Sequence, residues 1–107
     1  MTFARKGKFN ARRTVVDNIT FDSKKEALRY MDLKILSKTG RISKLELQPE
    51  YPMIVNGHKV CSYRADFRYV ENGKTVIEDV KGYKKNPLYS LKKKLLFACY
   101  NIKVCET

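Results

Sequence analysis

The sequence predicts an α+β domain in which a mixed β-sheet is flanked by helices. Apolar residues recur at helical spacing after Ser23 and again after Pro87, and Asn-Gly pairs separate runs of strand-forming residues. A chain of 107 residues with 43% hydrophobic residues can build one core. We therefore expect a single domain over residues 13–107, preceded by a flexible basic arm over residues 1–12.

The first two elements expected are an extended segment and a helix. Residues 13–21 favour a short strand pair or an extended lead-in. A helix over residues 23–38 follows, because Asp22 or Ser23 can cap it and Gly40 can end it.

Strands and a second helix make up the rest of the chain. Asn-Gly pairs at 56–57 and 72–73 predict two antiparallel hairpins, because a type I′ turn needs positive φ at both central residues. Asn86 as N-cap and Pro87 at the first helical position predict a helix that ends near Tyr100. The strands are expected at residues 45–48, 51–55, 60–70, 74–80 and 102–105.

Charge is the first indication of function. The chain has 23 Lys and Arg against 11 Asp and Glu, a net charge of +12, which favours a polyanionic partner. A solvated, highly soluble surface is the simpler alternative. The basic side chains expected to hold phosphates are Arg5, Lys6, Lys8, Arg12, Arg13, Arg64, Lys84, Lys85, Lys92 and Lys93.

Other features exclude several classes of protein. The N-terminal residues lack an apolar region, and no run of about 18 apolar residues occurs, so we expect neither secretion nor membrane insertion but a cytoplasmic protein. The three cysteines form no C-x-x-C pair, which indicates neither a disulfide framework nor a zinc site.

The hairpin at Asn72-Gly73 places two carboxylates opposite each other. Counting outward from this turn on each strand brings Asp66 opposite Asp79 and Arg64 opposite Lys81, with all four on one face. Two carboxylates about 5 Å apart repel by about 3 kcal/mol at an effective dielectric constant of about 20. Packing alone gives no reason for this arrangement.

A divalent cation between Asp66 and Asp79 would turn this repulsion into attraction. Oxygen ligands favour Mg²⁺, which keeps several waters and binds phosphate oxygens. Lys81 projects toward the same place, where it can hold the attacking water or offset charge on the phosphate. The three residues therefore indicate phosphodiester hydrolysis.

Two alternatives stay open for this hairpin. Asp66 and Asp79 can form surface salt bridges with neighbouring basic residues. Glu78 competes with Asp79 as a ligand, although the register sends it to the opposite face and only a bulge would exchange the two. That opposite face is the expected core face and collects Ala65, Phe67, Tyr69, Val76 and Val80.

The chain also resembles a known group of enzymes, the PD-(D/E)XK nuclease superfamily and, within it, small phage-encoded, resolvase-like endonucleases. The resemblance covers residues 20–83 and rests on FDSKKEALRY, LELQPEY, YRADFRY and IEDVKGY. Ala65-Asp66 stands for the Pro-Asp element, Asp79-Val80-Lys81 for the acidic-x-Lys element, and Glu26 for the helical glutamate. Ala65 replaces proline, which leaves the ligand unchanged.

The resemblance implies a restriction-endonuclease-like αβββαβ core and a set of site residues. Glu26 has an alternative role, because Ser23 to Glu26 also fits a capping box. Gln48 could likewise be a plain strand residue. The implied metal ligands are Asp66, Asp79, the Val80 carbonyl and Glu26, with Lys81 assisting the water and Gln48 orienting water or phosphate.

The resemblance further implies a phage-type endonuclease of DNA recombination that works in the host cytoplasm. Its cofactor would be Mg²⁺, for which Mn²⁺ substitutes, with no small-molecule cofactor. So small a domain has little surface for reading bases, so branched or nicked DNA such as a Holliday junction is the expected substrate. Symmetric cutting of two strands favours a homodimer. The alternatives are a non-catalytic DNA- or RNA-binding accessory protein and an RNA-associated basic protein.

Overall fold

The computed structural model of the chain describes residues 13–80 and 87–107, which form an α+β arrangement with a mixed sheet, as predicted. The central sheet has the strand order β3-β6-β7-β8, with β7 and β8 parallel and the other pairs antiparallel. The elements are β1 (Thr14–Val16), β2 (Ile19–Phe21), α1 (Lys24–Lys38), β3 (Ser43–Leu47), β4 (Glu50–Val55), β5 (His58–Arg64), β6 (Phe67–Glu71), β7 (Lys74–Asp79), α2 (Pro87–Tyr100) and β8 (Val104–Glu106).

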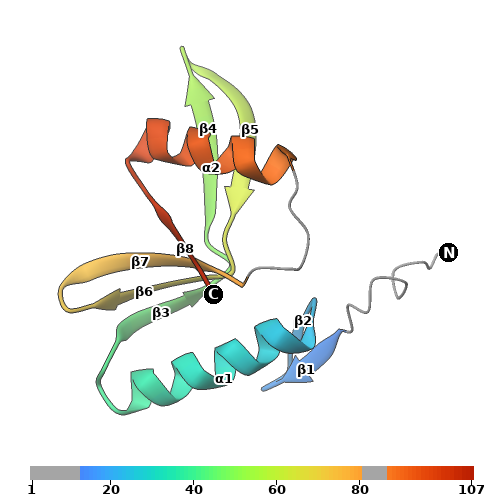
Figure 1. Cartoon of the computed structure of the whole chain (residues 1–107), viewed down its shortest axis with the longest axis vertical. Helices are drawn as coiled ribbons and strands as arrows, with labels where there is room; N and C mark the ends of the chain where they lie inside the picture. The colour runs from blue at the N-terminus through green and yellow to red at the C-terminus, as the bar shows by residue number, and fades with distance from the viewer. Residues whose placement is uncertain (1–12, 81–86) are drawn as a thin grey trace, which may run out of the picture.

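The central sheet separates two hydrophobic clusters. Figure 1 shows α1 with the β1–β2 pair on one side of the sheet and α2 with the β4–β5 hairpin on the other. Strand β7 serves both clusters, because Val76 packs with the α1 side and Ile77 with the α2 side. The α1-side cluster is centred on Phe21, Ala27, Tyr30, Leu33, Ile42, Phe67 and Tyr69, and the α2-side cluster on Tyr51, Met53, Tyr63, Ala65, Ile77 and Leu96.

Both helices begin near the predicted residues. The Ser23 hydroxyl accepts a hydrogen bond from the Glu26 amide at 3.1 Å, so Ser23 is the N-cap of α1. The second helix starts at Pro87, whereas its predicted cap, Asn86, lies outside the described residues. The last strand begins at Val104, later than predicted.

The two Asn-Gly hairpins are confirmed. Asn56 and Gly57 have φ values of 51° and 77°, and Asn72 and Gly73 have 52° and 76°. Positive φ at both central residues gives the turn a twist that matches the flanking strands. The register from Glu71 opposite Lys74 to Phe67 opposite Glu78 is the predicted one.

The prediction of one strand over residues 60–70 is wrong, because the chain bends at Ala65 and Asp66. The Ala65 amide donates to the Pro49 carbonyl at 3.1 Å, where the chain passes from β3 to β4. Arg64 therefore belongs to β5, where it pairs with Glu50, and not to the β6–β7 hairpin. The bend also turns Ala65 into the α2-side cluster, away from Phe67.

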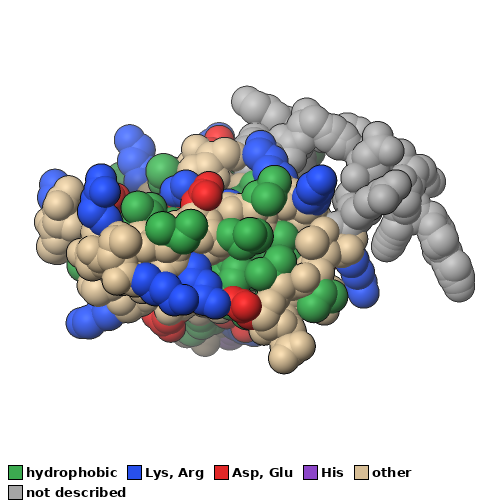
Figure 2. All heavy atoms as spheres, turned by 90° about the horizontal axis from the view of Figure 1, so that it is seen from below, with side chains coloured by type: hydrophobic (Ala, Val, Ile, Leu, Met, Phe, Trp, Pro, Cys, Tyr) green, Lys and Arg blue, Asp and Glu red, His purple; other side chains and the backbone are tan. Residues whose placement is uncertain are grey.

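The outer face of α1 is partly apolar. Figure 2, which views the molecule from the α1 side, shows hydrophobic side chains gathered between charged ones. Leu28, Met31 and Ile35 are exposed by 51%, 45% and 61%, and their spacing places them on one stripe of the helix. Neither α1 nor α2 is long and apolar enough to cross a membrane.

Candidate active site

Asp66 and Asp79 meet where β6 begins and β7 ends, as the hairpin register predicts. The Asp66 amide donates to Asp79 Oδ1 at 2.9 Å, and the Val80 amide donates to Asp66 Oδ2 at 2.8 Å. A further bond from the Asp66 amide to the Glu78 carbonyl, at 3.2 Å, continues the ladder. Backbone amides of the same hairpin therefore fix both carboxylates.

Asp79 is held by a tyrosine as well as by the backbone. The Tyr63 hydroxyl donates to Asp79 Oδ2. Tyr89 of α2 lies close enough to lower the pKa of this carboxylate, while its hydroxyl donates to Glu106 Oε2 at 2.8 Å. Only 8% of Asp79 is exposed, and this burial raises its pKa, although the Asp66 amide and Tyr89 lower it in part. The donors around Asp79 are neutral, so they orient the carboxylate without cancelling its charge.

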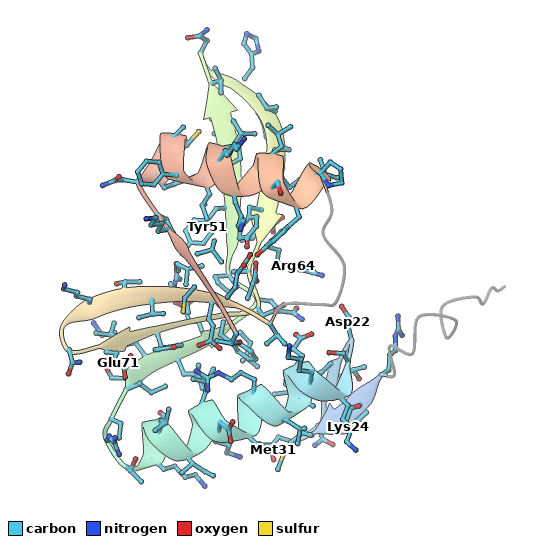
Figure 3. The ribbon with its side chains drawn as sticks, viewed as in Figure 1. Asp22, Lys24, Met31, Tyr51, Arg64 and Glu71 are labelled. Carbon is cyan, nitrogen blue, oxygen red and sulfur yellow. The ribbon has the colours of Figure 1, made fainter. Side chains whose placement is uncertain are left out.

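Asp66 is also made less acidic by its surroundings. Burial raises the pKa of Asp66, and the charges of Asp22 and Glu78 raise it further, while the Val80 amide and Arg64 oppose the shift. Arg64 and Asp22 lie on the same side of the molecule in Figure 3, one at the end of β5 and the other before α1. Within the described residues, no Lys or Arg forms an ion pair with Asp66 or Asp79.

Glu26 lies in the first turn of α1, close enough to Asp66 and Asp79 for their charges to raise its pKa. Burial raises its pKa to about 7, and the negative charges of Asp66, Asp22 and Asp79 raise it as well. A hydrogen bond with the Asp22 backbone opposes the shift. The Ser23 hydroxyl accepts a hydrogen bond from the Glu26 amide, so one of the two hydrogen bonds of a capping box is present. The Glu26 residue, however, is only 7% exposed, and its carboxyl group is within electrostatic range of Asp66 and Asp79.

Glu78 lies on the opposite face of β7 from Asp79, as predicted, and has different partners. Its carboxylate is fully buried and accepts two hydrogen bonds from Arg29, from Nε at 2.7 Å and from Nη2 at 2.8 Å. The Tyr69 hydroxyl donates to Glu78 Oε2 at 2.6 Å. Both oxygens are thus engaged, and the β6–β7 register has no bulge that would exchange Glu78 with Asp79.

Gln48 and Val80 approach the pair through their backbones. Gln48 lies just after β3, with a positive φ of 53° that is uncommon outside glycine, and its amide donates to the Asp66 carbonyl at 2.9 Å. The predicted strand placement of Gln48 is therefore wrong, although the residue does lie beside Asp66. Val80 is half-buried and bonds Asp66 through its amide.

The structure describes four of the ten basic residues that were predicted to hold phosphates. Arg13 and Arg64 are exposed and Lys92 is half-buried. Lys93 pairs with Glu106 at 2.7 Å and lies 4.9 Å from the centre of the Tyr89 ring, so it stabilises α2 against β8. Residues Arg5, Lys6, Lys8, Arg12, Lys81, Lys84 and Lys85 lie outside the described part of the chain.

The donor set suits a hard cation that takes few protein ligands. Over residues 13–80 and 87–107, no three His, Cys, Asp or Glu side chains come close enough to form a metal site by themselves. Mg²⁺ is usually held by one or two carboxylates together with substrate phosphate and water. Asp66 and Asp79 fit that pattern, with Glu26 nearby as a further acidic group.

Two contributors to the site are not evident as site residues in the sequence. Tyr63 and Tyr89 suggest only stacking or core-edge side chains, yet Tyr63 bonds Asp79 and Tyr89 lies close enough to lower the pKa of that carboxylate. Tyr63 lies three residues before Asp66, so its place in the YRAD segment is a usable signal. Tyr89 comes from α2 and carries no local signal, because only tertiary packing brings it to β7.

Comparisons with known proteins identify a family but no activity. The chain has no significant match among curated proteins or among solved structures. A family model described as "Protein of unknown function (DUF1064)" matches residues 6–105, and the chain belongs to that family.

Proposed function

We propose that this protein is a metal-dependent DNA endonuclease that hydrolyses phosphodiester bonds. The observation that carries the proposal is the pairing of Asp66 with Asp79, fixed by backbone amides and within electrostatic range of Glu26. Burial raises the pKa of both aspartates, and a bound cation would stabilise their charged forms. The four-stranded mixed sheet, with α1 packed against one face, supports a restriction-endonuclease-like arrangement.

Asp66 and Asp79 would hold the metal, with the Val80 carbonyl and Glu26 as further ligands, direct or through water. A bound Mg²⁺ or Mn²⁺ would supply a Lewis acid for the phosphate and a water of lowered pKa. Tyr63 keeps the Asp79 carboxylate in one orientation. Glu26, with a pKa of about 7, can take a proton from water near neutral pH.

Lys81 and the basic surface would also contribute to cleavage and to DNA binding. Lys81 would stabilise charge that develops on the phosphate. The net charge of +12 would hold the DNA backbone in a salt-dependent way. Recognition would depend on DNA shape, with branched or nicked duplexes such as Holliday junctions as substrates, which suits a phage-type enzyme of DNA recombination.

Cutting two strands at symmetric positions would require two copies of this site, so the proposal includes a homodimer. The exposed stripe of Leu28, Met31 and Ile35 on α1 offers an apolar surface for a second copy. Sedimentation should show a dimer that Met31→Lys weakens. A monomer, both alone and with junction DNA, would contradict this part.

The test is cleavage of a labelled four-way junction, a nicked duplex and a linear duplex, in about 5 mM Mg²⁺ or in EDTA. Asp66→Asn, Asp79→Asn and Lys81→Ala should each lower the rate at least about a hundredfold. Asparagine keeps an oxygen that accepts the backbone amides, so the fold is preserved.

Asp32→Asn is the matched control, because Asp32 is exposed on α1 and the substitution changes charge equally. It should cut like the wild type. Metal-dependent cutting that survives in Asp79→Asn would place the active site elsewhere, and no cutting of any of the three substrates would remove the proposal.

A non-catalytic nucleic-acid-binding protein is the second candidate. The observation that favours it is that, in the described part of the chain, no three candidate ligands form a metal site by themselves. It predicts tight junction binding in EDTA without cleavage, and an RNA-associated variant of it predicts tighter binding to RNA than to branched DNA.

A further inference from the structure

A pocket of about 410 Å³ opens between β5 and the start of α2, beside the candidate active site. Tyr63 connects the two places, because it lines the pocket and bonds Asp79. Its ring stacks on that of Tyr89 with centroids 6.3 Å apart, so the two rings form one wall of the pocket. The other described residues of the lining are Glu50, Ser62, Arg64, Leu88 and Lys92.

The pocket contains two cations that the fold leaves available. Arg64 is exposed and Lys92 is half-buried, and neither side chain forms an ion pair or hydrogen bond with another described residue. Arg64 ends β5, two residues before Asp66, so the pocket adjoins the carboxylate pair. Among the described residues of the lining, Glu50 is the one acidic side chain, which leaves a net positive charge.

Lys92 has different surroundings from Lys93 and Lys94, the lysines that follow it on α2. Lys93 is paired with Glu106, which fixes it against β8. Lys94 faces another cavity, which it lines with Phe97 and Ile102. Lys92 alone of these three lines the pocket beside Tyr63 and Arg64.

We propose that this pocket is a nucleotide subsite, which rests on the proposed nuclease function. It takes the DNA nucleotide next to the scissile bond and holds that nucleotide's phosphate between Arg64 and Lys92. Guanidinium and ammonium groups are the usual protein donors to phosphate oxygens. The volume is in the range of small-ligand sites, and the apolar edge of Leu88 and Tyr89 suits a deoxyribose. Glu50, which also lines the pocket, would oppose phosphate binding by charge repulsion.

The first test uses thymidine 3′,5′-bisphosphate as the probe, titrated into the labelled full chain in EDTA and followed by amide NMR. The amides of Ser62, Arg64 and Tyr89 should shift in the wild type. Arg64→Gln and Lys92→Gln should each weaken binding about tenfold, because each removes a charged hydrogen bond. Lys94→Gln, the matched control on the same helix, should bind like the wild type.

Glu50→Gln provides a test of opposite sign. Removal of this carboxylate should tighten binding of the probe about threefold, as expected for the loss of one partly screened repulsion. An unchanged or weaker affinity in Glu50→Gln would overturn the placement of the phosphate. Equal affinity of the wild type, Arg64→Gln and Lys92→Gln would overturn the subsite itself.

The second test separates the subsite from the nuclease activity. Junction affinity in EDTA should fall about tenfold in Arg64→Gln and Lys92→Gln relative to Lys94→Gln. If the protein cuts DNA while these variants match Lys94→Gln in both assays, the subsite is wrong and the nuclease stands. If the probe binds as expected while no DNA is cut, the nuclease is wrong and the pocket is a nucleotide site of another kind.

Discussion

Glu78 and Asp79 are consecutive residues of β7, yet their surroundings differ completely. Glu78 points to the α1 side, where Arg29 binds both of its oxygens and Tyr69 adds a third hydrogen bond. Asp79 points to the α2 side, where its hydrogen-bond donors are the Tyr63 hydroxyl and a backbone amide. One strand therefore carries two buried carboxylates, only one of which has a fixed cation among the described residues.

Under the proposed function, the difference separates a structural carboxylate from a metal ligand. The Glu78 bonds raise the pKa of Arg29 above its ordinary value, as expected for a pair whose charges stabilise each other. Burial raises the pKa of Asp79, which is the sign of a charge that is only partly compensated. A buried carboxylate such as Asp79, whose charge is only partly compensated, can bind a cation from solution. A carboxylate such as Glu78, which is already paired with an arginine, cannot.

The largest expected effect comes from breaking the Glu78 pair. Arg29→Met would leave a buried carboxylate without its cation and should lower the free energy of unfolding by about 3–5 kcal/mol. Lys93→Met, which removes a cation from the Asp79 side, should cost less than about 1 kcal/mol because that pair is partly exposed. Urea unfolding at neutral pH measures both values.

The double variant Arg29→Met with Glu78→Leu is the control, and it should recover most of the stability that Arg29→Met loses. A loss in Arg29→Met no larger than that in Lys93→Met would mean that the two sides of β7 do not differ as described.

The second prediction concerns pH. The folded-state pKa of Glu26 is about 7, above its ordinary value of 4.5, so the folded protein keeps this proton longer than the unfolded chain does. Stability should therefore fall as pH rises from about 4.5 to 7, by about 2–3 kcal/mol for this group. The raised pKa values of Asp66 and Asp79 act in the same direction.

Glu26→Gln should remove most of this pH dependence and raise the melting temperature near pH 8 in EDTA. Glu71→Gln, at an exposed turn position, is the control and should leave the curve unchanged. A Glu26→Gln protein with the same melting profile as the wild type would show that Glu26 is an ordinary capping residue.

The third prediction compares two tyrosines. Tyr63→Phe and Tyr69→Phe each remove one hydrogen bond to a buried carboxylate and should each cost about 1–2 kcal/mol in urea unfolding. Only Tyr63→Phe should also change the affinity for Mg²⁺ in calorimetric titration, because Tyr69 serves Glu78. An equal change in both variants would contradict the assignment of Asp79 as the metal ligand.

The smallest expected effect is stabilisation by the metal itself. With a dissociation constant of about 2 mM, about 10 mM Mg²⁺ should add about 1 kcal/mol to the free energy of unfolding. The gain should vanish in Asp79→Asn and persist in Asp32→Asn. Thermal unfolding with and without Mg²⁺ measures it, and a gain of equal size in Asp79→Asn would indicate binding at another place.

Local chemistry accounts for the parts of the fold and site that the sequence predicts. The Asn72-Gly73 turn sets the register of its hairpin, so the pairing of Asp66 with Asp79 can be predicted from the sequence alone. The boundaries of α1 follow in the same way from Ser23 and Gly40.

Contacts between distant segments account for what sequence reasoning missed. The bend at Ala65 depends on a bond to the Pro49 carbonyl, and Arg29 meets Glu78 across 49 positions of the chain. Neither hydrophobic periodicity nor turn residues predict such contacts. The sequence pattern also does not show that β7 is covered on both faces. Glu78 and Asp79 are charged residues, which usually indicate an exposed strand end.

The place of β7 between two hydrophobic clusters has a consequence for local unfolding. A strand covered on both faces opens only when both clusters separate from it, so the amide hydrogens of Ile77 and Glu78 should exchange with solvent more slowly than those of β1 and β2, which pack on one side. Asp79 ends this slowly exchanging strand. The backbone that carries Asp79 should therefore keep its geometry while β1 and β2 open.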